Sequence, residues 1–307
     1  MEMRKIEKNY RFFSNYDFFA PGPGGVGMLI LWFLAGALLG NLISLPIMLL
    51  LGGGDDAQMY AMLVAYPVMF IPAMMYASYK SRENSFFGKG YKLSNDHYVP
   101  LGATMCCILV VLVTIVTSFL ADSIISLLPP MPEVLEKLLS GMTQGNFLVN
   151  FLSVSIFAPF FEEWLCRGMI LRGLLNYEHK NKEGETVRGM KPVWAIVISA
   201  AIFAIIHANP WQAIAAFSLG MLFGYVYYRT GSIKLTMLMH FANNTFALVM
   251  SNIDKFKDME SWKEVMPGAL YWAVLAFCVV FIVYFVHKFL SIKPLDRQGS
   301  CAELASE

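Results

Sequence analysis

The stretch FFEEWLCR, residues 160–167, places two adjacent carboxylates and one guanidinium inside an apolar segment that runs from about residue 147 to 175. A helix of that length can cross a bilayer. Moving one charge to the bilayer centre costs at least about 2.5–3.5 kcal/mol. The charges in this stretch therefore need partners inside the protein, and the rest of the chain has to supply them.

The three charged residues have different prospects of pairing within their own helix. Glu163 and Arg167 are four residues apart, on one helical face and in the favourable acid-before-base order. We expect them to form a buried ion pair that holds this helix in register. Glu162 points about 100° away around the helix and has no partner there. An unpaired carboxylate inside a membrane is a candidate functional group.

The composition places the chain among polytopic membrane proteins. Of 307 residues, 57% are hydrophobic and only 15% are charged, whereas soluble proteins carry about 25% charged residues. The net charge of +1 does not bear on nucleic-acid binding. No basic patch interleaved with aromatic residues lies outside the juxtamembrane loops, so a nucleic-acid partner is not expected. Four of the five cysteines fall in apolar segments, and none has CxxC or metal-ligand spacing.

Apolar runs separated by Gly, Pro and charged residues predict an all-α bundle of about eight transmembrane helices. The expected spans are residues 27–51, 58–78, 101–128, 147–175, 192–208, 211–228, 232–250 and 268–290. The corresponding domains are an interfacial N-terminal arm (1–26), spans one to three with an amphipathic interfacial piece near 133–139 (27–146), a catalytic core of spans four to seven (147–250), a loop with the last span (251–290), and a tail (291–307).

The distribution of basic residues orients this bundle. With the N-terminus in the cytoplasm, the opposite side receives only Lys137, Lys255, Lys257 and Lys263, and Arg167 lies in the membrane. The remaining 18 of the 23 Lys and Arg residues are cytoplasmic. Such a bias predicts that both termini are cytoplasmic.

Two histidines and an asparagine lie in later spans at a depth similar to that of Glu162. A rise of 1.5 Å per residue puts Glu162 roughly 18 Å from the cytoplasmic side, His240 roughly 14 Å and His207 roughly 23 Å. Asn244 is one turn after His240, on the same face. Each of these polar groups alone would be explained by an ordinary hydrogen bond between membrane helices. Together with a free carboxylate, they favour a site.

The order of these groups resembles a known family. Glu162-Glu163-x-x-x-Arg167, Phe203-x-x-x-His207 and His240-x-x-x-Asn244 are similar to the three motifs of the CAAX-protease and bacteriocin-processing (Abi) family of intramembrane endopeptidases. The similarity covers about a third of the chain. The stretch from Gly220 to Ser232 also resembles bacterial members, which implies a bacterial inner membrane.

By this resemblance Glu162, His207, His240 and Asn244 form the catalytic set, with Glu163, Arg167, Phe203 and Asn243 in supporting positions. A carboxylate in an apolar cavity is a suitable general base near neutral pH. Glu162 is then expected to activate water. His240 and Asn244 would stabilise the oxyanion, and His207 would position the water or protonate the leaving amine.

A metal site is the alternative to this mechanism. Glu162, His207 and His240 could ligate zinc with a water in the fourth position. There is no HExxH pair, and zinc ligation by Glu162 would leave no carboxylate base unless Glu163 gave up Arg167. The resemblance to the Ras-converting CAAX endopeptidase favours a metal-independent glutamate mechanism without a cofactor.

The expected function is hydrolysis of peptide bonds in a membrane-associated or lipidated substrate. The second hypothesis is a non-catalytic bacteriocin-immunity or scaffolding protein, but such a protein would be expected to have lost one of the four catalytic side chains. The third is a proton-coupled transporter, in which Glu162 and the histidines relay protons. Inverted repeats are frequent in transporters, and spans one to three carry no matching polar set.

Overall fold

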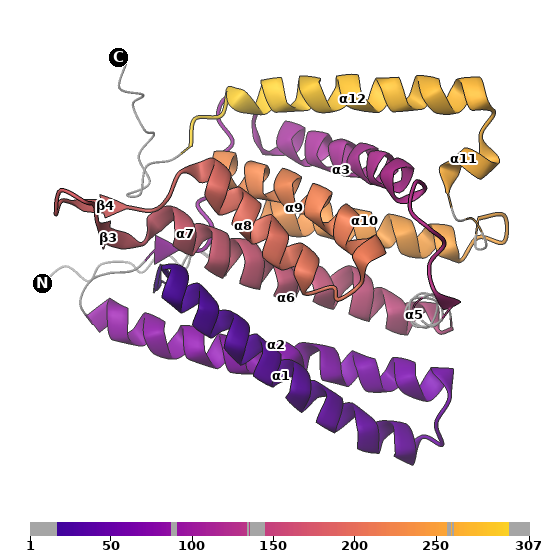
Figure 1. The fold of residues 1–307 in the computed structure, drawn as a ribbon, viewed down its shortest axis with the longest axis horizontal. Helices are drawn as coiled ribbons and strands as arrows, with labels where there is room; N and C mark the ends of the chain where they lie inside the picture. Colours follow the sequence, from indigo (N-terminus) through magenta and orange to yellow (C-terminus); the bar gives the residue numbers. More distant parts are fainter. Residues whose placement is uncertain are drawn as a thin grey trace, which may run out of the picture.

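The computed structural model describes residues 17–86, 91–133, 135, 145–256, 259 and 261–294. Within these ranges the chain is a bundle of roughly parallel and antiparallel helices, and two small sheets lie at one end (Figure 1). Of the residues that the structure describes, 75% are helical, which confirms the all-α class. Most of the predicted N-terminal arm, interfacial piece and C-terminal tail falls outside the described residues.

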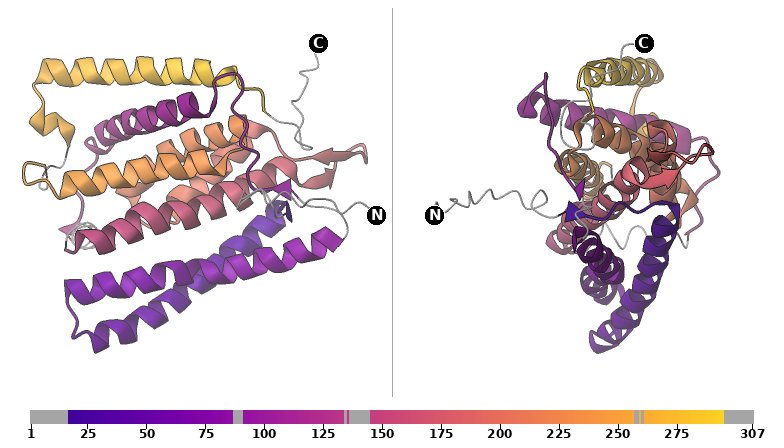
Figure 2. Two further views of the ribbon diagram at one scale, coloured as in Figure 1. Left: turned by 180° about the vertical axis from the view of Figure 1, so that it is seen from behind. Right: turned by 90° about the vertical axis from the view of Figure 1, so that its left-hand side faces the viewer.

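The first two helices form an antiparallel pair on one flank of the bundle (Figure 2). Helix α1 (Pro23–Leu50) and helix α2 (Asp55–Phe86) are joined by three glycines with positive φ. They cross closely at Gly36, where a Cβ atom would lie 2.0 Å from the carbonyl oxygen of Met69. Gly36 and Gly40 form a GxxxG pair on α1. This pair is a packing surface against α2, as expected for small residues between membrane helices.

Helix α3 (Ala103–Ile125) and helix α12 (Gly268–Leu290) pack together on the opposite flank (Figure 1). The short helix α11 (Trp262–Val265) precedes α12. The outer faces of α1 and α12 expose large apolar side chains; Leu42 of α1 is 70% exposed and Val280 of α12 is 66% exposed. Such surfaces are suited to lipid rather than water.

The charged stretch lies in a long helix that is not a regular α-helix. Its segments are α5 (Phe147–Asn150), π-helical η1 (Phe151–Phe157), α6 (Ala158–Glu163), π-helical η2 (Trp164–Leu171) and α7 (Arg172–Asn176). The α-helical turn that ends with Glu162 and Glu163 is thus flanked by two π-helical segments. Short π-helical insertions occur frequently at functional sites.

Helices α8 (Pro192–Ile205), α9 (Pro210–Thr230) and α10 (Ile233–Ser251) fill the middle of the bundle. Proline starts α8 and α9, and Gly231, with φ +61°, ends α9. The side chain of Asn209 caps α9 and that of Ser232 caps α10. These caps make sharp reversals, so the three helices pack side by side.

Five helices in the described part of the chain are long and apolar enough to cross a membrane: Pro23–Leu50, Asp56–Glu83, Ala103–Ile125, Phe147–Asn176 and Gly268–Leu290. An integral membrane protein is thereby supported. The three further spans of the expected eight correspond to α8, which has only 14 residues, and to α9 and α10, which carry more polar side chains. The total of about eight remains a prediction.

The two sheets are short antiparallel strand pairs beside the ends of α2, α7 and α9. Strand β1 (Asp17–Phe18) pairs with β2 (Tyr91–Lys92), and β3 (Glu178–Lys180) pairs with β4 (Thr186–Arg188). The second pair lies between the expected spans at residues 147–175 and 192–208.

Buried Arg172 ties β1 to the long helix. Its guanidinium donates to the carbonyl oxygens of Phe19 and Gly168, each at 2.6 Å.

Candidate active site

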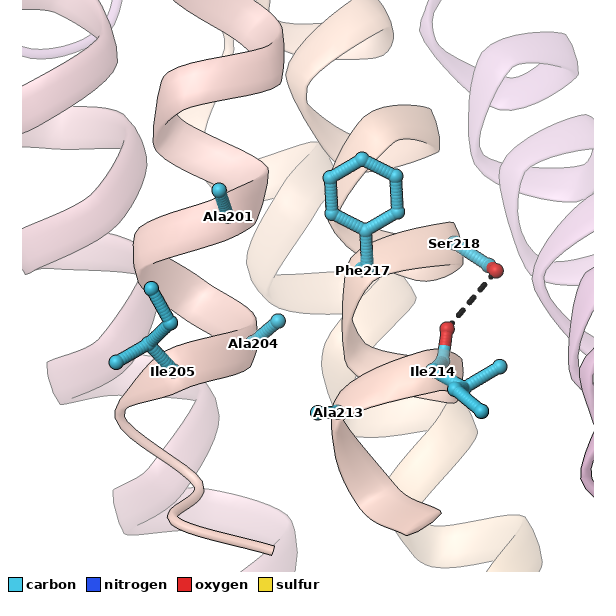
Figure 3. Close-up of a pocket in the computed structure, with 7 residues that line it drawn as sticks. All are labelled: Ala201, Ala204, Ile205, Ala213, Ile214, Phe217 and Ser218. Atoms are coloured by element: carbon cyan, nitrogen blue, oxygen red, sulfur yellow. Dashed lines mark hydrogen bonds between the residues drawn. The ribbon is translucent and has the colours of Figure 1, made fainter. Parts of the chain in front are cut away.

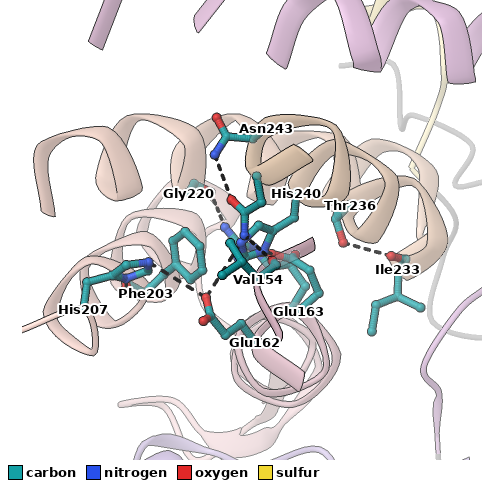
Figure 4. Close-up of polar contacts among 12 residues, drawn as sticks. Val154, Glu162, Glu163, Phe203, His207, Gly220, Ile233, Thr236, His240 and Asn243 are labelled. Atoms are coloured by element: carbon teal, nitrogen blue, oxygen red, sulfur yellow. Dashed lines mark hydrogen bonds and ion pairs between the residues drawn. The ribbon is translucent and has the colours of Figure 1, made fainter. Parts of the chain in front are cut away.

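The polar groups predicted from the sequence meet in the middle of the bundle. They come from the long helix at α6 and η2, from the end of α8 and from α10, and Figure 4 shows them converging. Glu162, Glu163 and His240 are buried, and the side chain of His207 is only 23% exposed. The three sequence motifs therefore form one cluster.

Glu163 and Arg167 form the expected ion pair. Oε1 of Glu163 lies 2.7 Å from Nη1 of Arg167, and both side chains are fully buried. The guanidinium also donates to the carbonyl oxygen of Gly220 on α9 at 3.2 Å. It lies over the rings of Phe203 and Phe223, with Cζ 4.4 and 5.1 Å from the ring centroids. Arg167 thus joins the long helix to α8 and α9 through a charge, a carbonyl and two aromatic faces.

His240 connects the two carboxylates. Its Nδ1 lies 3.0 Å from Oε1 of Glu163, and because a carboxylate accepts hydrogen bonds, Nδ1 carries the hydrogen. Its Nε2 lies 3.9 Å from Oε2 of Glu162. The ring therefore has one nitrogen held by the ion pair and the other facing Glu162.

His207 approaches Glu162 from the opposite direction. It lies in the turn after α8, two residues past the helix end, and not on the expected helix that extended to residue 208. Its Nδ1 lies 2.7 Å from the carbonyl oxygen of Phe203. A carbonyl only accepts, so Nδ1 is the donor. Its Nε2 is left facing Oε2 of Glu162 at 4.0 Å.

The two oxygens of Glu162 have different surroundings. Oε1 accepts a hydrogen bond from the hydroxyl of Tyr66 on α2. Oε2 is buried and has no hydrogen-bond partner among the described residues, although Nε2 of both histidines lies within 4.0 Å of it. The side of the cluster with this unsatisfied oxygen and two imidazole nitrogens is its candidate reactive side.

Asn244 takes part in one hydrogen bond to another helix and one within α10. Its Nδ2 donates to the carbonyl oxygen of Val154 at 2.8 Å, and its Oδ1 accepts from Nδ2 of Asn243 at 3.0 Å. Asn243 in turn accepts from Ser118 of α3 at 2.6 Å. An amide nitrogen carries two hydrogens, so one N–H of Asn244 remains after the bond to Val154.

The cluster is more widely spaced than the ligands of a bound zinc ion. Two ligand atoms bound to tetrahedral zinc at 2.0–2.1 Å lie about 3.3 Å apart. The histidine nitrogens lie 3.9 and 4.0 Å from Oε2 of Glu162. Across the residues that the structure describes, no group of three or more His, Cys, Asp or Glu side chains is arranged to hold a metal ion.

Sequence reasoning missed several residues that the structure adds to the cluster. Tyr66 comes from α2, more than ninety residues before Glu162, and no motif sets it apart from Tyr60 or Tyr76. The Gly220 carbonyl and the ring of Phe223 also could not be assigned from spacing. Each contact joins segments distant in the chain, so only the packed fold reveals it.

An apolar groove of about 380 Å³ lies between α8 and α9 (Figure 3). Its lining consists of Ala201, Ala204, Ile205, Ala213, Ile214, Phe217 and Ser218. The serine hydroxyl donates to the carbonyl oxygen of Ile214 at 2.9 Å. The groove is thus a surface for apolar groups, on the helix that leads to His207.

Comparison with known proteins identified a family for the central region. Residues 144–246 match the family model described as type II CAAX prenyl endopeptidase Rce1-like. Searches of curated proteins and of solved structures gave no match. The matched segment contains α5 to α9 and the part of α10 that carries His240 and Asn244. This match confirms the resemblance seen in the three motifs: the central third of the chain is similar to the Rce1-like CAAX prenyl endopeptidases.

Proposed function

We propose that the protein is an intramembrane endopeptidase that cleaves a peptide bond in a membrane-associated or lipidated substrate. The observation that carries this proposal is the approach of two imidazole Nε2 atoms to the unpaired Oε2 of Glu162. Both imidazoles turn Nδ1 to a protein oxygen. A water molecule placed among the three atoms could donate hydrogen bonds to Oε2 and to Nε2 of His207.

In the proposed reaction Glu162 removes a proton from this water, and the water oxygen attacks the scissile carbonyl carbon. The tetrahedral intermediate carries negative charge on the former carbonyl oxygen, which needs fixed donors. The remaining N–H of Asn244 and Nε2–H of His240 are assigned to it. This role requires His240 to carry hydrogen on both ring nitrogens.

The reaction ends with protonation of the leaving amine and cleavage of the C–N bond. The proton taken up by Glu162 passes to the amine nitrogen, directly or through Nε2 of His207. Glu163 and Arg167 do not exchange protons in this scheme. They fix the position of His240 through its Nδ1 hydrogen.

The mechanism is proposed to be metal-independent. If Glu162 were a metal ligand, Glu163 would be the remaining carboxylate of the cluster, and it is occupied by Arg167 and His240. Treatment of the purified protein with 1,10-phenanthroline or EDTA should leave its peptidase activity unchanged. Loss of activity with recovery on adding zinc would contradict this part of the proposal.

The substrate is proposed to carry an apolar chain, because the groove between α8 and α9 is lined almost entirely by apolar atoms and runs along the helix that leads to His207. The family description names a prenyl endopeptidase. An isoprenoid chain resting in the groove would hold the adjoining peptide near the end of α8. The proposal places this reaction in a bacterial inner membrane, in a bundle of about eight spans with both termini cytoplasmic.

Cleavage of an internally quenched peptide with a farnesylated CAAX sequence tests the proposal. The protein is reconstituted in liposomes, and Glu162→Gln is compared with Glu185→Gln, which removes an exposed carboxylate on the β3–β4 turn. We expect the wild type and Glu185→Gln to cleave, and Glu162→Gln to be inactive. If the wild type cleaves neither this peptide nor any membrane protein in a comparison of termini from expressing cells, the immunity or scaffolding alternative takes precedence.

A further inference from the structure

Tyr66 contacts the proposed base from outside the matched family region. It lies on α2, whereas the matched segment begins at residue 144. Its hydroxyl donates to Oε1 of Glu162. Helix α2 packs against η1 and α6, the segments that lead to Glu162. The contact therefore connects the first helix pair to the reactive side of the cluster.

Aromatic packing fixes the Tyr66 ring. Its centroid lies 5.6 Å from that of Phe70, one turn further along α2. Phe70 stacks on Phe161 with centroids 5.2 Å apart and planes inclined by 18°. Phe161 directly precedes Glu162 in the chain. The hydroxyl and the carboxylate are thus held by one continuous set of packed rings.

The identity of the acceptor sets the Tyr66 hydrogen bond apart from the hydrogen bonds that tyrosine hydroxyls inside proteins commonly form. A buried tyrosine usually finds some acceptor, and a backbone carbonyl is sufficient. Tyr66 instead binds the carboxylate whose second oxygen has no partner among the described residues. The terminal torsion of a glutamate is broad, so a donor on Oε1 decides where Oε2 points.

We propose that Tyr66 is a positioning residue for Glu162, which holds Oε1 so that Oε2 stays directed at His207 and His240. The inference rests on the proposed function, in which Oε2 accepts the proton of the attacking water. Tyr66 touches no reacting atom. Its effect is on the orientation of the base and hence on the chemical step, not on binding of the substrate.

The kinetic test uses Tyr66→Phe, which removes the hydroxyl and keeps the ring and its packing on Phe70. The matched control is Tyr60→Phe, on the same helix, whose side chain is 40% exposed. With the quenched farnesylated peptide we expect Tyr66→Phe to lower kcat by about 10- to 100-fold, because misplacing a catalytic group costs up to about that much. KM should change less than about two-fold, and Tyr60→Phe should match the wild type.

A second measurement is independent of activity. Dicyclohexylcarbodiimide is an apolar reagent that modifies carboxyl groups inside membranes, and its adduct is found by mass spectrometry. Tyr66 is the hydrogen-bond donor to Oε1, and Oε2 has no donor among the described residues. Tyr66→Phe therefore leaves neither oxygen of Glu162 with a donor, and its labelling rate should increase several-fold. Glu162→Gln assigns the adduct to this residue and not to Glu163. Thermal unfolding of each variant confirms that it is folded.

The outcomes separate the inference from the proposed function. A lower kcat with unchanged KM and faster labelling supports both. If labelling becomes faster but the wild type cleaves no substrate, Tyr66 still positions Glu162 and the peptidase proposal fails. The role of Tyr66 is overturned if Tyr66→Phe labels Glu162 at the wild-type rate. It is also overturned if the wild type cleaves the peptide and Tyr66→Phe has the same kcat.

Discussion

The two sides of the polar cluster differ in the kind of partner that each carboxylate has. On the ion-pair side, Oε1 of Glu163 is bound by Arg167 and His240, and Arg167 has further contacts with the Gly220 carbonyl and two aromatic rings. On the open side, Glu162 has one donor on Oε1, and Oε2 faces two imidazole nitrogens at 3.9 and 4.0 Å. The two carboxylates are neighbours in sequence, yet their surroundings are unlike.

This difference indicates how two adjacent carboxylates can have separate roles, one in stability and one in chemistry. A buried ion pair fixes helix positions, and removing one partner leaves a costly lone charge. Glu162 has no Arg or Lys partner among the described residues, and such a buried carboxylate is costly in itself and remains available for chemistry. His240 joins the sides because its Nδ1 is fixed by Glu163 while its Nε2 faces Glu162. Fold stability should therefore depend on Glu163 and activity on Glu162.

The largest effect is expected from Glu162→Gln. The amide retains the size of the side chain but cannot accept a proton, so cleavage of the farnesylated peptide should fall by about 10²–10⁴-fold, the usual contribution of a general base. The midpoint of thermal unfolding should stay close to that of the wild type. Activity within ten-fold of the wild type would contradict the assignment of Glu162 as the base.

Arg167→Met, unlike Glu162→Gln, should lower the stability of the fold. Breaking a buried ion pair costs about 3–5 kcal/mol because the remaining carboxylate stays buried and uncompensated. The free energy of unfolding, measured in detergent micelles, should fall by that order. The double variant Glu163→Gln with Arg167→Met should be more stable than Arg167→Met alone. Glu163→Gln alone completes the cycle. If the double variant loses as much stability as the two single variants together, the pair is not coupled.

Much of the fold could be predicted from the sequence because apolar runs and their Gly and Pro boundaries are local signals. The expected span at residues 268–290 agrees with α12, and those at 211–228 and 232–250 differ from α9 and α10 by at most two residues at either end. The π-helical segments and the β3–β4 pair were not predicted. A π-helical insertion leaves no composition signal, and a short hairpin rich in charged residues looks like a loop.

The site was predicted in part. Glu163 with Arg167 follows from helix periodicity, and the meeting of Glu162, His207 and His240 follows from similar depth in the membrane. Periodicity could not show that His207 lies beyond the end of α8, since the chain stays apolar up to it. The Tyr66 contact depends on how α2 packs against the long helix, which no local pattern encodes.

The open side can be examined further through the groove between α8 and α9. Ala213→Trp would fill the groove that we assign to the apolar chain of the substrate. We expect KM for the farnesylated peptide to rise about ten-fold or more, since a lost apolar contact is worth roughly 1–3 kcal/mol. Cleavage of the same peptide without the lipid should be unchanged by this substitution. Val280→Trp, on the exposed face of α12, is the control.

An exposed ion pair offers a contrast with Glu163 and Arg167. Asp96, in the segment before α3, binds Lys234 at the start of α10 and accepts from the hydroxyls of Ser94 and Ser232 at 2.5 and 2.7 Å. The Lys234 side chain is 44% exposed, and exposed pairs contribute only about 0.2–1 kcal/mol. Asp96→Asn should therefore lower the free energy of unfolding by no more than about 1 kcal/mol at pH 7.

The pH dependence of this small effect has a defined sign. Burial raises the pKa of Asp96, but the hydrogen bonds from Lys234, Ser94 and Ser232 outweigh burial and hold the pKa below its ordinary value of 3.8. The carboxylate therefore stabilises the folded state above pH 3.8, and this contribution is lost as the pH falls through the lower pKa of the folded state. Stability curves of the wild type and Asp96→Asn should converge in that acidic range. A difference that persists at the acidic end would show that Asp96 stabilises the segment through hydrogen bonds that asparagine cannot form, and not through its charge.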